Sequence, residues 1–419
     1  MSQEPNLFWK KVGFIFSGTA LAQAIPLLGS LLIARIYAPT EFGVFAAWLG
    51  VVSVAAIVLT GRFEAALAVV PDGEPRRLAA CATFIVAAGV AVLAGAALLL
   101  VRWLLPSLFV SFTIGLIWLL VPASFAMACT NIWQYWAAAE GRLRLLAAIR
   151  IVQACAITGA QIIIGYMAPN AIVLAGGYFG GVILTVLWAA AIMPLRRNEQ
   201  EKLEWREAMQ FWSAYRRFPL LALPADSINT IAAQLPIFIL ATRFGTEVAG
   251  YFALAMRVLG APISLLGTAV LDVFKRVSAT SFREQGHCRE DYRRTFRVLA
   301  TGAVFATIIL ISVSEFAFTF FFGEQWREAG VFAVWLMPMF AFRFVASPLS
   351  YVFYITNKQH VDLGWQVALL LVTMFSLYFP RDHITAIQAY STGYSGLYVF
   401  YLWLSWYFSK GVKKNDSHC

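Results

Sequence analysis

Charged side chains are scarce in this sequence of 419 residues, and their scarcity is the first guide to its class. Asp, Glu, Lys and Arg together make up 13% of the residues, about half of their usual share in soluble domains. Hydrophobic residues make up 60% and the mean hydropathy is +0.72. These values exclude a string of soluble domains and an intrinsically disordered chain. We therefore expect an all-α polytopic membrane protein.

Cysteine and histidine are also few. The five cysteines are an odd number without a CxxC pair, and none falls in a segment predicted to lie outside the cytoplasm, so no disulfide framework is implied. The four histidines lack the spacing of metal ligands. A P-loop and a cleavable signal peptide are also missing. We expect no cofactor, no metal site and no ATP hydrolysis by this chain.

Long apolar runs dominate what is present. A membrane-spanning helix needs about 20 mostly apolar residues, and the sequence contains twelve such runs. They are predicted at 12–34, 43–67, 79–101, 112–137, 147–167, 171–194, 219–241, 249–274, 298–322, 331–356, 363–380 and 386–409. An even number places both termini on the same side of the membrane.

The distribution of the basic residues orients these spans. There are 32 Lys and Arg against 22 Asp and Glu, which gives a net charge of +10. By our assignment 24 of the 32 lie in the termini and the even-numbered loops, and five lie on the opposite side. The positive-inside rule then predicts cytoplasmic termini. This topology accounts for the positive charge, and no nucleic-acid partner is expected.

The chain is predicted to consist of two related halves. An N-terminal six-helix bundle covers 1–194, a cytoplasmic amphipathic linker helix 195–218, a C-terminal six-helix bundle 219–409 and a cytoplasmic tail 410–419. After its first span each half carries a Thr-Glu pair, a Gly and a Phe-Ala pair, in 40–46 and in 246–253. Transporters built from two parallel repeats bind their cargo between the halves and alternate in access.

Four stretches together resemble a known family. They are 33–43 (IARIYAPTEFG), 61–71 (GRFEAALAVVP), segments of 215–259, and 321–326 with 346–350. In these stretches the sequence resembles the polysaccharide-transporter (Wzx-type) flippases of the multidrug/oligosaccharidyl-lipid/polysaccharide (MOP) exporter superfamily. The lipid II flippases of that superfamily typically have fourteen spans, so a count of twelve argues against that branch.

The resemblance implies a fold, a cellular location and a cargo. It implies a MATE-like arrangement of twelve helices in the bacterial inner membrane, with the lipid bilayer as the surroundings. The implied cargo is an undecaprenyl-diphosphate-linked oligosaccharide, such as an O-antigen or another exopolysaccharide repeat unit. This cargo would move from the cytoplasmic to the periplasmic leaflet by alternating access, in a transporter and not an enzyme. A polysaccharide polymerase is an implied partner.

Charged residues inside spans are the candidate site, because each costs about 2.5–3.5 kcal/mol to insert. Arg62, Arg257 and Arg343 are the deep cations. A diphosphate suits bidentate guanidinium binding, so we predict that Arg257 and Arg343 line a cationic cavity between the halves. Arg62 would bind the cargo at the cytoplasmic rim. Asn229 and Gln134 would add neutral polar contacts.

Two carboxylates are candidates for coupling or gating. Glu64 follows Arg62 in span two, and Asp226 lies in span seven. Either could couple transport to a proton or sodium gradient. The alternative is that these charges form structural pairs, Arg62 with Glu64 or Asp272 and Arg257 with Asp226.

Two alternative functions fit the sequence less well than a flippase. A membrane glycosyltransferase or polymerase of the same pathway would need large outer loops, whereas the predicted outer loops are too short to fold into a domain. A MATE-like drug/cation antiporter would favour acidic residues in its cavity, whereas the deep charges here are mainly basic.

Overall fold

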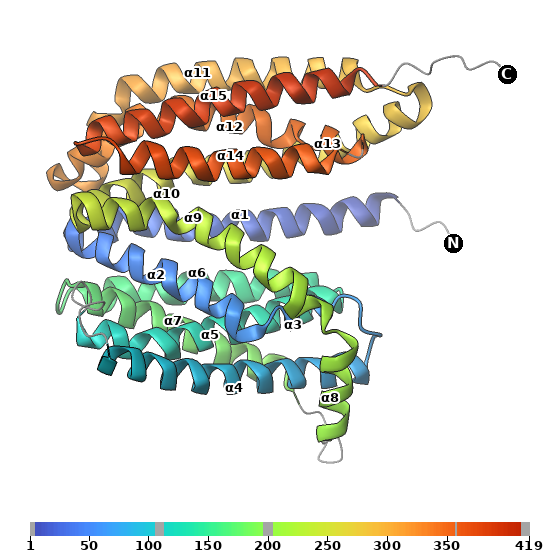
Figure 1. The fold of residues 1–419 in the computed structure, drawn as a ribbon, viewed down its shortest axis with the longest axis vertical. Helices are drawn as coiled ribbons and strands as arrows, with labels where there is room; N and C mark the ends of the chain where they lie inside the picture. Colours follow the sequence, from blue (N-terminus) through green and yellow to red (C-terminus); the bar gives the residue numbers. More distant parts are fainter. Residues whose placement is uncertain (1–4, 105–112, 196–203, 357, 412–419) are drawn as a thin grey trace. The chain divides into compact units, whose positions relative to one another are not determined.

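The structure, a computed structural model, describes residues 5–104, 113–195, 204–356 and 358–411 (Figure 1). Within these ranges the chain is almost entirely helical and contains no strand. The chain divides into two compact units, Met1–Leu235 and Pro236–Cys419. The boundary between the two units falls inside a helix.

The first unit is built around one central helix. Its elements are α1 (Pro5–Ile36), α2 (Pro39–Thr60), α3 (Phe63–Ala66), α4 (Glu74–Leu104), α5 (Ile114–Ala139), α6 (Leu143–Gly165), α7 (Ala171–Ile192), α8 (Trp205–Ala214), a π-helical turn (Phe218–Ala222) and α9 (Leu223–Phe244), which continues into the second unit. Helix α5 packs against α2, α4, α6 and α7, while α1 packs on α6. Buried indoles join these helices: Trp48 of α2 donates to the Leu116 carbonyl oxygen of α5 at 2.9 Å.

The second unit repeats this packing pattern. It contains α10 (Thr246–Gln285), α11 (Arg289–Phe322), a 3-10 turn (Glu324–Trp326), α12 (Arg327–Leu349), α13 (Val352–Ile355), α14 (Gln359–Tyr378) and α15 (His383–Ser409). Helix α12 packs against α10, α11 and α15, and α14 packs on α15. In the first unit α5 packs in the same way against α2, α4 and α7, and α6 packs on α7. The repeated pattern agrees with the related outer turns in the sequence.

The helices have the length and composition of membrane spans. In the described ranges, nine stretches of helix are long and apolar enough to cross a membrane. The described residues of α1, and helices α10 and α15, are not among these nine but coincide with the first, eighth and twelfth predicted spans. The chain is therefore a multi-pass helical membrane protein, and the count of twelve stays a prediction.

Several helix limits differ from the predicted ones; α10 and α11, for example, extend beyond the predicted spans 249–274 and 298–322. The second span was expected to run from 43 to 67, but α2 ends at Thr60, because Gly61 (φ 58°) and Arg62 (φ 61°) turn the chain into the left-handed region. The linker was expected to form one helix over 195–218. In the described part, helix α8 covers only Trp205–Ala214, and residues 196–203 lie outside the description.

Small residues allow a close contact between α6 and α7 in the first unit. A Cβ atom on Gly181 of α7 would lie 2.5 Å from the backbone of Ile157 in α6, and one on Gly177 would lie 2.9 Å from the backbone of Gln161. These glycines are four residues apart, the spacing that brings membrane helices together. The neighbouring Gly180 has nothing within 4 Å of the same position.

We predict that Gly181→Ala lowers the free energy of unfolding by ~1–3 kcal/mol, because the backbone of α6 would have to move. Gly180→Ala is the matched control and should be neutral or stabilising by about 0.4–1 kcal/mol. Thermal unfolding of the two purified variants in the same detergent compares them. Equal melting temperatures would show that the contact between α6 and α7 is not tight.

Candidate functional site

Arg62 occupies an unusual position in the backbone. It lies between α2 and α3 with φ 61° and ψ 14°, and it is the one non-glycine residue with positive φ in the part of the chain that the structure describes. Such a conformation costs about 1–3 kcal/mol and persists where the surroundings hold it, commonly at functional sites. Glycine would fit this backbone with less strain, so the guanidinium is retained at an energetic cost.

The Arg62 side chain joins three elements of the first unit. Its Nη1 atom lies 3.0 Å from Oε1 of Glu64 in α3, and its Nε atom lies 2.7 Å from Oδ2 of Asp226 in α9. Nη1 also donates to the Tyr135 hydroxyl of α5 at 3.3 Å, and the guanidinium carbon is 5.7 Å from the centre of that ring. We call these four residues the Arg62 cluster.

The Arg62 cluster has a buried end and an accessible end. The Glu64 side chain is 2% exposed, whereas that of Asp226 is 39% exposed. The expected pairing of Arg62 with Glu64 is therefore present, and Asp226 pairs with Arg62 as well. The side chain of Asp272, the other suggested partner of Arg62, lies outside the described residues. With two carboxylates on one guanidinium, an anionic ligand at Arg62 would compete with Asp226, the more exposed of the two.

Asn229 and Gln134 are not members of the Arg62 cluster. Asn229 is exposed on α9, one helical turn after Asp226. Gln134 precedes Tyr135 on α5, but its amide nitrogen donates to Gln153 at 3.0 Å and its oxygen accepts from Arg150 at 3.2 Å, both on α6. Gln134 therefore belongs to a polar network between α5 and α6.

The other two predicted arginines belong to the second unit. Arg257 lies on α10 and is partly buried. Arg343 lies on α12 and is exposed, although it sits well inside the apolar stretch Glu324–Ile355. Tyr390 and Tyr398 lie on α15, which packs against α12. No carboxylate of the described residues lies within 4.0 Å of the Arg343 guanidinium.

Sequence reasoning missed Tyr135. It is 73 residues from Arg62, so no local spacing could connect them, and its neighbour Gln134 drew attention instead. The one available signal is a tyrosine in a polar segment near the predicted cytoplasmic end of span four.

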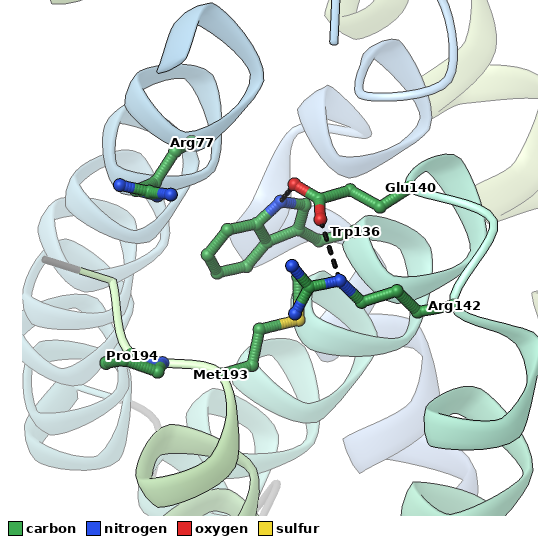
Figure 2. A pocket seen from close by; sticks show the side chains of 6 residues that line it. All are labelled: Arg77, Trp136, Glu140, Arg142, Met193 and Pro194. Atoms are coloured by element: carbon green, nitrogen blue, oxygen red, sulfur yellow. Dashed lines mark hydrogen bonds and ion pairs between the residues drawn. The ribbon is translucent and has the colours of Figure 1, made fainter. Parts of the chain in front are cut away.

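The first unit also contains a cavity of about 260 Å³ near the end of α5, shown in Figure 2. It is lined by Arg77, Trp136, Glu140, Arg142, Met193 and Pro194. Both carboxylate oxygens of Glu140 are used internally, one accepting from the Trp136 indole at 2.9 Å and one lying 3.0 Å from Nε of Arg142. This cavity could not be located from sequence spacing, because its lining comes from α4, from the end of α5 and the residues after it, and from the residues after α7.

Comparison with known proteins connects the sequence to polysaccharide biosynthesis. The family described as polysaccharide biosynthesis protein matches residues 32–331. The teichuronic acid biosynthesis protein TuaB of Bacillus subtilis (strain 168) is 22% identical over 218 residues. That match covers 48% of this chain and 45% of TuaB, so it spans about half of each protein.

Solved structures show the same fold. The lipid II flippase MurJ in an inward closed conformation has a TM-score of 0.70 at 13% identity, covering 94% of this chain and 87% of that chain. A multidrug resistance MATE transporter of the MOP superfamily, inward-facing, has a TM-score of 0.60 at 13% identity, covering 91% and 93%. The chain therefore shares the fold of these transporters, and the family match agrees with the polysaccharide-transporter resemblance found in the sequence.

We predict that Arg62→Ala destabilises the protein by about 3–5 kcal/mol, because it leaves the buried Glu64 without a charge partner. Adding Glu64→Gln should restore much of this loss. Tyr135→Phe is the control and removes one long hydrogen bond, worth ~0.5–1.5 kcal/mol. Thermal unfolding of the single and double variants forms the cycle. If Arg62→Ala costs no more than Tyr135→Phe, the Arg62 cluster does not stabilise the fold.

Proposed function

The chain belongs to the polysaccharide biosynthesis protein family, and we propose that it is a flippase for undecaprenyl-diphosphate-linked oligosaccharide. It moves an O-antigen or other exopolysaccharide repeat unit from the cytoplasmic to the periplasmic leaflet of the bacterial inner membrane by alternating access. It has twelve spans, cytoplasmic termini and no catalytic role. The MOP-superfamily fold and the similarity to MurJ and TuaB support this proposal.

The observation that carries the proposal is the exposed Arg343. A guanidinium within an apolar span costs about 2.5–3.5 kcal/mol unless it reaches water or a partner. No carboxylate of the described part of the chain pairs with it. Two parallel N–H donors match the oxygens of a diphosphate. We assign Arg343 and Arg257 to the headgroup.

The Arg62 cluster supplies a gate in this mechanism. Arg62 holds Asp226 at 2.7 Å, and Asp226 lies on α9, whose residues continue into the second unit. Diphosphate oxygens that bind Arg62 would replace the Asp226 carboxylate and free the start of α9. Protonation or sodium binding at Asp226 would also weaken its pair with Arg62, whereas at Glu64 it would weaken the buried pair. Either carboxylate offers a route to ion coupling. The membrane potential also favours outward movement of an anion, by about 2.3 kcal/mol per charge per 100 mV.

The connections on the predicted outer side fit a transporter. Two residues, Tyr37 and Ala38, join α1 to α2, Gly245 alone joins α9 to α10, and five residues join α6 to α7. A segment this short cannot fold into a catalytic domain. The catalytic residues of a polymerase or glycosyltransferase would have to lie outside these connections.

We predict that Arg343→Ala reduces translocation about 10- to 100-fold, as expected from the loss of charged hydrogen bonds, while Arg343→Lys retains part of the activity. The assay is complementation of a null strain, with the leaflet location of the lipid-linked units measured at equal protein level. Arg283→Ala, at the exposed end of α10, is the control and should transport normally.

Three outcomes of this assay would contradict the proposal. Normal transport by Arg62→Ala, Arg257→Ala and Arg343→Ala would exclude a cationic cargo site. Export of single units by the null strain would indicate a polymerase, since a flippase defect leaves complete units on the cytoplasmic leaflet. Normal movement of lipid-linked units together with lost drug efflux would indicate an antiporter.

We predict that a green fluorescent protein fused after the tail 410–419 is fluorescent, since a cytoplasmic C-terminus lets the reporter fold. Alkaline phosphatase fused at the same place should be inactive, because it requires the periplasm. Activity of the phosphatase fusion together with a dark fluorescent fusion would reverse the topology.

A further inference from the structure

Basic residues line one face of α11 in the second unit. Arg289, Arg293 and Arg297 are spaced four residues apart, and all three are exposed. Like charges at this spacing repel one another. Glu290 and Asp291 are close in sequence, yet in the described structure no carboxylate lies within 4.0 Å of any of the three guanidinium groups. We therefore expect an external anion to balance the charge of these three arginines.

Aromatic side chains of α15 face these arginines. Helices α11 and α15 lie side by side here (Figure 1). The guanidinium carbons of Arg289 and Arg293 lie 5.1 and 5.7 Å from the centre of the Trp406 ring, and Nζ of Lys410 lies 5.9 Å from it. Cation–π attraction holds the three cations near this indole, although each guanidinium keeps N–H groups for a further ligand.

Between the two helices lies a cavity of about 390 Å³. It is lined by Tyr292, Arg293, Phe296, Arg297, Leu402, Trp403 and Trp406. Its floor is fixed by the Tyr292 hydroxyl, which is 2.7 Å from the Ser405 hydroxyl and donates to the Leu402 carbonyl oxygen at 3.1 Å. Two arginines and an otherwise mostly apolar wall make a site with one cationic end.

Apolar surface continues from this cavity along both helices. Val298 and Phe305 of α11 are each 68% exposed, and Phe400 of α15 is 52% exposed. In a membrane such residues contact acyl chains. A ligand that satisfies both parts of the surface has an anionic headgroup and an apolar tail.

We propose that this pocket, the α11–α15 pocket, binds an anionic glycerophospholipid of the surrounding leaflet. Arg293 and Arg297 hold the phosphodiester, Trp403 and Trp406 contact the glycerol region, and the tails follow the apolar surface. Basic pockets between membrane helices on the cytoplasmic side recognise such headgroups, and this end of α11 is cytoplasmic in the proposed topology. Binding occurs wholly within the second unit and is separate from the cargo arginines Arg257 and Arg343.

The test compares full-length protein in nanodiscs of phosphatidylcholine with and without phosphatidylglycerol. We expect phosphatidylglycerol to raise the melting temperature and to remain bound in native mass spectrometry. In the variant Arg293→Gln/Arg297→Gln, affinity for phosphatidylglycerol should fall about 10- to 30-fold, as expected for the loss of two basic contacts. The matched control Arg283→Gln/Arg294→Gln removes the same charge from residues outside the pocket lining and should bind normally.

Several results would overturn the proposal. Equal binding by Arg293→Gln/Arg297→Gln and the unmodified protein would exclude the pocket, and equal loss in the control variant would indicate attraction by net charge alone. Stabilisation by inorganic phosphate to the same extent would indicate a soluble anion. Binding of undecaprenyl diphosphate but not phosphatidylglycerol would make the pocket part of the cargo path. Since phosphatidylglycerol binding needs no transport, these results are independent of the flippase assay.

Discussion

The free-energy cost of placing guanidinium groups in a hydrocarbon layer is the constraint on which the other features of this structure depend. An arginine in that layer must find a carboxylate, an aromatic ring, water or an anionic ligand. The protein uses several of these solutions. Arg62 lies beside two carboxylates and a tyrosine, and Arg343 is exposed within an apolar stretch. Outside the hydrocarbon layer, Arg289 and Arg293 of α11 approach Trp406. Each solution leaves a different capacity for binding an anion.

The packing of the helices supports these charged sites. Lipid offers little hydrophobic drive for helix association, so contact depends on shape and on hydrogen bonds. Gly177 and Gly181 bring α7 against the backbone of α6, and Trp48 and Tyr37 donate to backbone carbonyls of other helices. A rigid first unit of this kind can hold Arg62 in a strained conformation. The strain is useful if Asp226 is exchanged for a ligand during transport.

The class of protein and the approximate positions of the helices followed from the sequence alone, because hydropathy and loop charge are local properties that determine how each segment inserts into a bilayer. The end of α2 was misplaced for a local reason as well. Gly61 and Arg62 adopt left-handed conformations in the middle of an apolar run, and hydropathy does not report backbone dihedral angles. The linker helix α8 is shorter than its amphipathic pattern indicated.

Composition and spacing identified Arg62, Glu64 and Asp226 as polar residues in apolar surroundings, which is enough to mark them as costly and therefore purposeful. Tertiary structure alone decided that Arg62 takes both carboxylates and that Tyr135 joins them. It also decided that Gln134 bonds to α6 instead of joining that cluster. The physical reason is that insertion into lipid depends on each segment by itself, whereas the pairing of charges depends on the distances between segments far apart in the chain.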